Sequence, residues 1–185
     1  MRNLSPILLF ICLTCGVAAE AEHPSKAPAE AMNKLSSLSG DWQLQVKASF
    51  DDGKTWQQSE PVSVQLVFKQ RGLMLEEIPL QIVEQGFNMH TLITYDQYRQ
   101  VYRKAAIDDV WGIMDLYEGQ WQEDKLVFTN LKAGTLFPVG EDTWRGFRLT
   151  MQVSPDSRTT WIDKTDDMGK SWQPAFILEY KKKAS

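Results

Sequence analysis

Cysteine and histidine are almost absent from this chain of 185 residues. Cys12 and Cys15 both lie in the first twenty residues, and the only histidines are His23 and His90. The remainder of the chain therefore has no thiol, which excludes a disulfide framework and cysteine catalysis there. A serine–histidine–acid triad or a zinc site would have to rely on His90, and no metal-site spacing or nucleophile elbow accompanies it. We expect no cofactor and no metal.

Long hydrophobic runs are also missing, with one exception near the start. Ile7 to Val17 is a mostly apolar run that follows Arg2 and leads into small residues. This arrangement predicts a secretory signal peptide over residues 1–19, with cleavage after Ala19 or, alternatively, Ala21. The run is shorter than the ~20 apolar residues that span a bilayer, although a retained anchor is the alternative.

The compartment follows from the leader and the missing cysteines. Ile11 and Thr14, which precede the two cysteines, fit a lipoprotein signal poorly. Export without disulfides favours a periplasmic or secreted bacterial protein. No later segment is apolar enough to cross a membrane.

A concentrated positive charge is absent as well. Without its leader the chain loses one arginine and no acid, so 19 basic residues face 24 acidic ones and the net charge is −5. Basic residues are scattered apart from Lys181 to Lys183. Because nucleic-acid binding needs a basic face, we expect no nucleic-acid partner. No pattern indicates an oligomeric state.

What the chain does have is alternation. Residues 20–27 form a polar linker, and residues 28–185 a single domain that begins with one short helix, Pro28 to Leu38, stopped by Gly40. Apolar and polar residues then alternate, which predicts strands with one dry face and one wet face. The expected strands are 42–50, 62–68, 73–78, 87–95, 100–107, 110–117, 125–131, 147–153, 158–164 and 176–180. Gly119 is among the turn signals between them.

This series predicts an all-β fold. Helical crossovers are absent, so the strands must pair antiparallel. About nine or ten strands in a meander would leave two long edges unless the sheet closes. We therefore expect a closed up-and-down β-barrel with one short N-terminal helix; a sandwich or a propeller is the alternative.

Two near-identical segments mark hairpin turns. Residues 49–56 and 165–172 both read S/T-x-D-x-G-x-T/S-W and resemble the Asp-box of sialidases. Asp51 and Asp167 can accept bonds from the turn amides, and Gly53 and Gly169 can take positive φ. We expect Trp56 and Trp172 to cover the hairpin bases, so the motif predicts structure rather than sugar binding.

Motifs spread over residues 35–183 carry a wider resemblance. Gly40-Asp41-Trp42 resembles the G-x-W signature of lipocalins and other calycins. Together with Thr94-Tyr95-Asp96 and other matching segments, it makes the chain similar to a bacterial calycin-like family of unknown function. The other segments are Arg71 to Glu77, Val101-Tyr102, Tyr117 to Gly119 and Glu179 to Lys183. The resemblance implies a calycin barrel with Trp42 at its closed end; where lipocalins place an arginine over that tryptophan, this chain offers only Lys181 to Lys183.

The candidate ligand-binding residues are those that such a barrel could direct inward. Arg145 shares the phase of Phe147, so it points inward to an acidic ligand group or pairs with Asp115 or Glu118 at a rim. The other candidates are His90, Tyr102, Trp111, Met114, Trp161 and Phe176. Paired acids such as Asp108-Asp109 are expected to be solvated turn residues.

No catalytic set is evident, so two functions are expected. The first is an exported, non-enzymatic protein that binds a small, mostly apolar molecule inside the barrel, as better understood calycins do. The second is a structural or protein-interaction module of the cell envelope with a filled barrel.

Overall fold

The computed structural model describes residues 25–81 and 88–183, and within them twelve strands and one α-helix. The predicted signal peptide, residues 1–19, lies outside the described residues, as does the first residue of the strand expected at 87–95. No helix in the described ranges is long and apolar enough to cross a membrane.

Ten long strands follow the helix. The helix α1 (Ala27–Asn33) and the 3₁₀ turn Ser36–Leu38 precede the first strand, and a second 3₁₀ turn, Gln70–Gly72, joins β3 to β4. The long strands are β1 (Gly40–Ala48), β3 (Val62–Lys69), β4 (Met74–Pro79), β5 (Met89–Asp96), β6 (Val101–Asp108), β7 (Met114–Gln122), β8 (Lys125–Thr129), β10 (Trp144–Val153), β11 (Ser157–Thr165) and β12 (Gln173–Lys182). Two short strands, β2 (Gln57–Gln58) and β9 (Phe137–Pro138), pair with β1 and β10.

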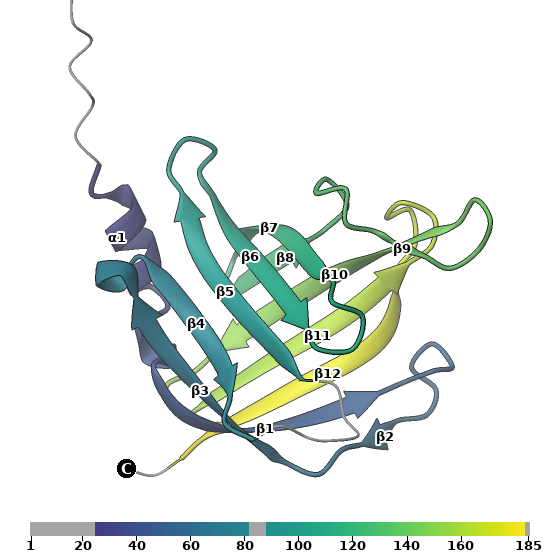
Figure 1. The fold of residues 1–185 in the computed structure, drawn as a ribbon, viewed down its shortest axis with the longest axis horizontal. Coiled ribbons are helices and arrows are strands. Elements are labelled where there is room, and N and C mark those ends of the chain that lie inside the picture. Colours follow the sequence, from purple (N-terminus) through teal and green to yellow (C-terminus); the bar gives the residue numbers. More distant parts are fainter. Residues whose placement is uncertain (1–24, 82–87, 184–185) are drawn as a thin grey trace, which may run out of the picture.

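These strands close into a barrel (Figure 1). Each long strand pairs antiparallel with its neighbours in the order β11-β12-β1-β3-β4-β5-β6-β7-β8-β10, and β10 pairs with β11 to complete the circle. The first and last strands meet along Trp42↔Lys182 to Ala48↔Phe176. The predicted closed antiparallel barrel is confirmed, because closure pairs the edges that an open sheet would expose.

Most predicted strands match, and the corrections have local causes. The strand expected at 110–117 begins at Met114, because Asp108 accepts bonds from the amides of Val110 and Trp111 and forms a turn there. Gly119 is wrong as a turn signal, since it lies inside β7. A β-carbon at Gly119 would stand 2.3 Å from the ring of Phe128, so glycine makes room for that ring.

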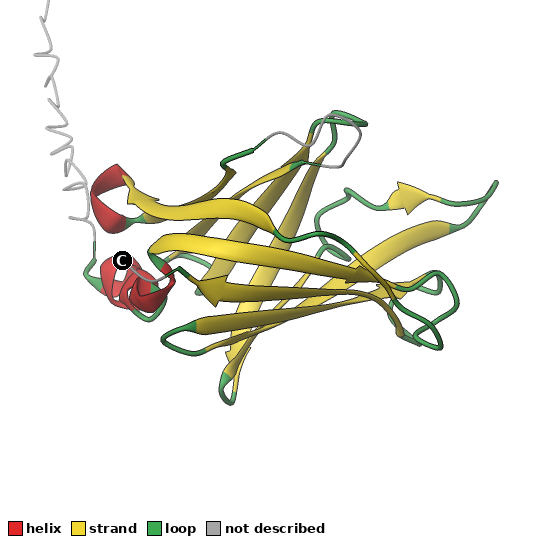
Figure 2. Cartoon of the chain, turned by 90° about the horizontal axis from the view of Figure 1, so that it is seen from below, coloured by secondary structure: helices red, strands yellow, loops and turns green. Residues whose placement is uncertain are grey.

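The helix seals one end of the barrel. The expected helix Pro28 to Leu38 ends early, at Asn33, and continues as the 3₁₀ turn. Figure 2 shows the helical segments at one end of the barrel. Four side chains there have no exposed surface: Met32, Leu35, Leu38 and Trp42. We call this the helix end.

Trp42 is held by contacts with Leu38 and Lys182. Its indole Nε1 donates to the carbonyl of Leu38 at 2.8 Å. The Lys182 ammonium lies 5.3 Å from the centre of the ring and donates to the Ser37 carbonyl at 2.9 Å. Of the three lysines Lys181 to Lys183, Lys182 is thus the one that lies over Trp42, and Gly40 has φ +129° where the Lys182 side chain passes within 3.2 Å of its β-carbon position.

The two Asp-box turns have the same hydrogen bonds. Asp51 accepts from the Thr55 amide at 2.8 Å, and Asp167 accepts from the Ser171 amide at 2.9 Å. Gly53 and Gly169 have φ near +86° (87° and 85°). Hydrogen bonds from Thr55 lower the pKa of Asp51 to about 2. Both turns lie at the end opposite α1, because they follow β1 and precede β12; we call it the open end.

Tyr95 and Asp96 are the last two residues of β5, before the turn that leads to β6. The Asp96 carboxylate accepts from the amides of Tyr98 and Arg99 and pairs with Arg103 at 3.3 Å. Hydrogen bonds from Arg99 therefore lower the pKa of Asp96. Tyr95 packs edge to face on Tyr102, with ring centres 5.1 Å apart. The two residues thus connect β5 to the turn and to β6.

Candidate functional site

The interior of the barrel is not uniformly covered. Inward apolar side chains on one wall, toward the open end, are only half-buried, although most of them pack against the core. We call them the lumen wall: Leu44 and Val46 on β1, Val62 on β3, Ile162 on β11 and Leu178 on β12. On each strand these residues alternate with outward-facing ones, and on β1 they share the inward phase of buried Trp42. Their exposed surface therefore faces the inside of the barrel.

Three charged or phenolic side chains meet inside the same barrel. Arg158 Nη2 donates to Glu77 Oε2 at 2.6 Å, and the Tyr180 hydroxyl donates to Glu77 Oε1 at 2.8 Å. The Arg158 guanidinium also stacks 3.4 Å from the centre of the Tyr180 ring. All three residues are buried, with exposed fractions of 7% for Glu77, 5% for Arg158 and 3% for Tyr180. Strands β4, β11 and β12 supply them.

Lys104 joins this group from the opposite wall. It lies on β6 between inward Ile93 and inward Tyr117 in the sheet register. It is half-buried, and its electrostatic neighbours are Glu77 and Arg158. We call Glu77, Lys104, Arg158 and Tyr180 the inner charged cluster.

Burial and mutual charge set the protonation states of the cluster. Burial raises the pKa of Glu77, but the charges of Arg158 and Lys104 outweigh it, and the pKa stays below its ordinary value. Desolvation lowers the pKa of Lys104 to about 8 against the attraction of Glu77. Burial raises the pKa of Tyr180. Near neutral pH the cluster therefore holds one carboxylate and two cations.

A second polar group lines the interior on the β7 side. Asp115 accepts two bonds from Asn130 Nδ2, both at 3.1 Å, and one from Thr135 Oγ1 at 2.5 Å. The Asn130 carbonyl oxygen accepts from the Phe147 amide at 2.7 Å. Desolvation and the charge of Asp115 raise the pKa of Tyr117 well above its ordinary value. These neutral donors satisfy the Asp115 carboxylate and fix the loop that follows β8.

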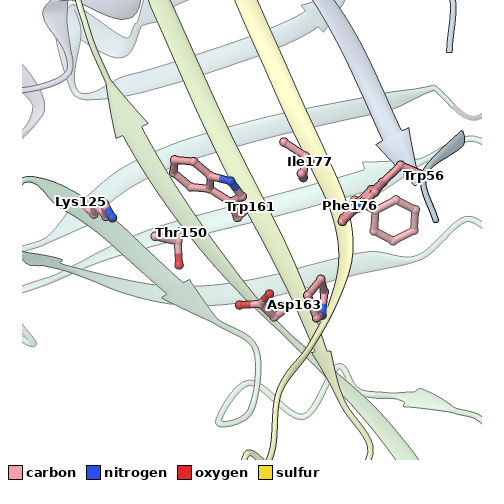
Figure 3. A pocket seen from close by; sticks show the side chains of 8 residues that line it. Trp56, Lys125, Thr150, Trp161, Asp163, Phe176 and Ile177 are labelled. Atoms are coloured by element: carbon pink, nitrogen blue, oxygen red, sulfur yellow. The ribbon is translucent and has the colours of Figure 1, made fainter. Parts of the chain in front are cut away.

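A separate groove lies on the outer face. Figure 3 shows its side chains gathered over β11 and β12. Its volume is 340 Å³, and its lining is Trp56, Lys125, Thr150, Trp161, Asp163, Pro174, Phe176 and Ile177. Lys125 lies 5.6 Å from the centre of the Trp161 ring. We call this the outer groove.

The structure distributes the sequence-predicted ligand residues rather than gathering them. Trp161 and Phe176 line the outer groove, whereas Tyr102 is buried inside and donates to the Ala31 carbonyl at 2.8 Å. Trp111 and Met114 are 69% and 53% exposed. Met114, the first residue of β7, points outward because it alternates with buried Asp115, and Trp111 lies in the turn that Asp108 organises before that strand.

The polar candidates are engaged elsewhere. His90 Nε2 lies 2.9 Å from Glu76 Oε1 on the outer face. The expected partners of Arg145 were wrong: it forms two bonds of 2.8 Å with Asp166, because Asp115 is held by Asn130 and Glu118 by Arg103. In the described part of the chain no group of three metal-binding side chains is arranged around a common point.

The inner charged cluster escaped the sequence reasoning. A usable signal existed for Glu77 and Lys104, because each occupies the phase of its strand that holds Leu75 or Tyr102. A charge on the dry phase indicates an inward ion. Arg158 shares its phase with Thr160 and Ile162, which marks the dry side of β11 less clearly.

Comparison with known proteins identifies the family of the chain. The structure is similar to that of the S-type phycobiliprotein lyase CPES from Guillardia theta, with a TM-score of 0.47 and 11% identity over 84% of this chain and 93% of that one. No curated protein matches the sequence. A family model described as "Protein of unknown function (DUF1579)" matches residues 27–182, and the chain therefore belongs to that family.

Proposed function

We propose that this protein is an exported, non-enzymatic carrier that holds one small, mostly apolar molecule inside its barrel. The observation that carries the proposal is the lumen wall: inward side chains such as Leu44, Ile162 and Leu178 keep exposed apolar surface. A ligand that covers this surface gains about 25 cal/mol for each Å² removed from water. Binding sites for small molecules are mostly apolar with a few polar anchors.

The direction of entry follows from the two ends. The helix end is sealed by four fully buried side chains, among them Trp42. The lumen wall extends from Leu44 toward the Asp-box turns at the open end. A ligand therefore enters between the loops of the open end and stops above Trp42 and Tyr180.

The carrier role, rather than catalysis, is supported by where the possible bases lie. General acid–base catalysis needs a base within hydrogen-bond reach of the bound substrate. His90 lies on the outer face beside Glu76, away from the lumen wall. Inside the barrel, both carboxylate oxygens of Glu77 already accept hydrogen bonds, one from Arg158 and one from Tyr180.

Binding is tested with the neutral fluorescent probe N-phenylnaphthylamine. We expect saturable binding with a stoichiometry near one and quenching of tryptophan emission. Leu178→Trp, which fills the lumen, should abolish binding. Ile177→Trp is the matched control, because Ile177 points outward into the outer groove.

The pair of variants separates the two surfaces. Loss of binding in Leu178→Trp alone supports the lumen. Loss in Ile177→Trp alone assigns the probe to the outer groove and overturns the proposal, as does the absence of saturable binding in the unaltered protein. Circular dichroism confirms that both variants fold.

The outer groove favours a second function, a protein-interaction module of the cell envelope. Trp161 and Trp56 present aromatic surface there, and exposed aromatic residues are enriched where proteins bind one another. Trp161→Ala should then weaken capture of an envelope partner and leave probe binding unchanged. Unchanged capture by Trp161→Ala would contradict this second function.

Export rests on residues 1–19 and is tested separately. Expression of the full chain in a Gram-negative host, followed by fractionation and N-terminal sequencing, should give a periplasmic product that begins after Ala19 or Ala21. A cytoplasmic product that retains Met1 would contradict export and leave the carrier proposal intact.

A further inference from the structure

The inner charged cluster contains more positive charge than its fold requires. Glu77 is paired with Arg158 and bonded by Tyr180. The charges of Glu77 and Arg158 cancel, yet Lys104 adds a second cation near this pair. Buried charge is costly, and replacing a buried ion pair by apolar residues is often neutral or stabilising. Stability alone does not explain the third charge.

One atom of the cluster has no partner. Arg158 Nε is buried and forms no hydrogen bond, and it is the one such side-chain nitrogen or oxygen in the described ranges. Buried polar atoms in native proteins are nearly always hydrogen-bonded. A guanidinium presents its donors in a planar fork suited to carboxylates, and here Glu77 occupies only part of it.

Lys104 is open to a space inside the barrel. Its side chain points inward with Ile93 and Tyr117, and protein encloses it, yet the residue keeps exposed surface. Among the described residues its ammonium forms no hydrogen bond or ion pair. An inward group with accessible surface borders a space that water or a ligand atom can enter.

The neighbouring acids do not neutralise this cation. Asp115, inward on β7, is bonded by the neutral side chains of Asn130 and Thr135 and keeps its charge, but the electrostatic neighbours of Lys104 are Glu77 and Arg158. Tyr117 and Tyr180 stay protonated near neutral pH, because burial raises the pKa of each phenol. Within the inner charged cluster Glu77 is the one carboxylate, so the two cations Lys104 and Arg158 leave an excess of one positive charge.

We propose that the lumen binds a carboxylic acid with an apolar tail, and that its carboxylate pairs with Lys104 and reaches the Arg158 guanidinium while its tail covers the lumen wall. This inference rests on the proposed carrier function and names its ligand class. Lys104 supplies the charge, and Arg158, fixed by Glu77 and Tyr180, supplies orientation.

The test uses two probes that differ in one charge, dansyl-labelled undecanoic acid and its methyl ester. In the unaltered protein the acid should bind about tenfold more tightly than the ester. Lys104→Met keeps the length of the side chain and removes the charge. It should weaken binding of the acid by about tenfold and leave that of the ester unchanged.

Two control variants bracket this result. Lys181→Met removes the same charge from an exposed position on β12 and should change neither affinity. Lys104→Arg keeps the charge and should restore most of the preference for the acid. Arg158→Met is not used as the main test, because it would leave Glu77 as a buried charge without its ion-pair partner.

The possible results are distinct. Equal affinities for acid and ester in the unaltered protein overturn the acid site and leave the carrier function standing. An acid preference that survives in Lys104→Met overturns the role of Lys104. If neither probe binds, the carrier function itself fails. Because the acid-to-ester ratio is measured on the unaltered protein, a poorly folded variant does not block the test.

Discussion

The two ends of the barrel use the same alternation of residues for different purposes. At the helix end, Trp42 and Leu38 are completely buried beneath α1 and the Lys182 side chain. Toward the open end, Leu178 and Ile162 occupy equivalent inward positions but keep exposed surface. The alternation along a strand therefore specifies which side chains point inward. Whether these side chains form packed core or line a binding site depends on what covers each end of the barrel.

This difference separates stability from binding within one sheet. Tight packing at the helix end supplies the free energy of folding, since well-packed interiors are sensitive to the loss of single groups. The less covered half can change its side chains at smaller cost. Binding surfaces are commonly drawn from such less stable regions.

The largest expected effect is at Trp42. Trp42→Ala removes a fully buried aromatic side chain and its bond to Leu38, and should lower the free energy of unfolding by about 3–5 kcal/mol. Urea denaturation measures the change. A loss below about 1 kcal/mol would show that α1 does not seal a packed core.

A pair of leucines sharpens the comparison. Leu66→Ala, in the buried half, should cost about 2–5 kcal/mol, whereas Leu178→Ala, on the lumen wall, should cost about 1 kcal/mol. Both variants replace leucine by alanine, so the difference between their denaturation midpoints reports how completely each leucine is covered by the rest of the protein. Equal losses would mean that the lumen wall is packed core.

The Asp-box tryptophans give a smaller contrast. Trp172 is half-buried under Arg148, whose guanidinium lies 4.6 Å from the ring centre, while Trp56 is 36% exposed. Trp172→Ala should cost about 1–3 kcal/mol and Trp56→Ala less than about 1 kcal/mol. Thermal melting of both variants checks the order, and unchanged melting in both would remove the structural role of the motif.

The smallest effect concerns pH. Because the pKa of Lys104 is about 8 in the folded protein and 10.5 in the unfolded chain, the unfolded state binds more protons between these values. Stability contributed by this residue should therefore rise with pH above about 8. Urea midpoints at pH 7.5 and 9.5 should differ by less in Lys104→Met than in the unaltered protein. An identical pH dependence in the two proteins would contradict a desolvated Lys104.

Much of the fold follows from the sequence because strand alternation and turn chemistry are local. The closed barrel and the two Asp-box turns were expected from residue patterns, and a closed end at Trp42 was expected from the resemblance to calycins. The start of β7 was missed because Asp108 organises the turn through its own side chain. Gly119 was misread because its reason, the Phe128 ring on β8, lies on another strand.

The candidate site was less accessible to sequence reasoning because it depends on which strands face one another across the barrel. Glu77, Lys104 and Arg158 are far apart in the chain and meet only after closure. Aromatic content pointed instead to Trp111, which is exposed, and to Trp161, which faces outward. Composition identifies large side chains but not the side of the wall on which they lie.

The seam between β1 and β12 has a consequence for synthesis. The first strand of the barrel pairs with the last one, and Lys182 on β12 lies over Trp42 on β1. Such pairing of distant segments makes folding slow. The ribosome must synthesise β12 before the barrel can close, so a nascent or truncated product that lacks β12 stays open and is exposed to proteolysis.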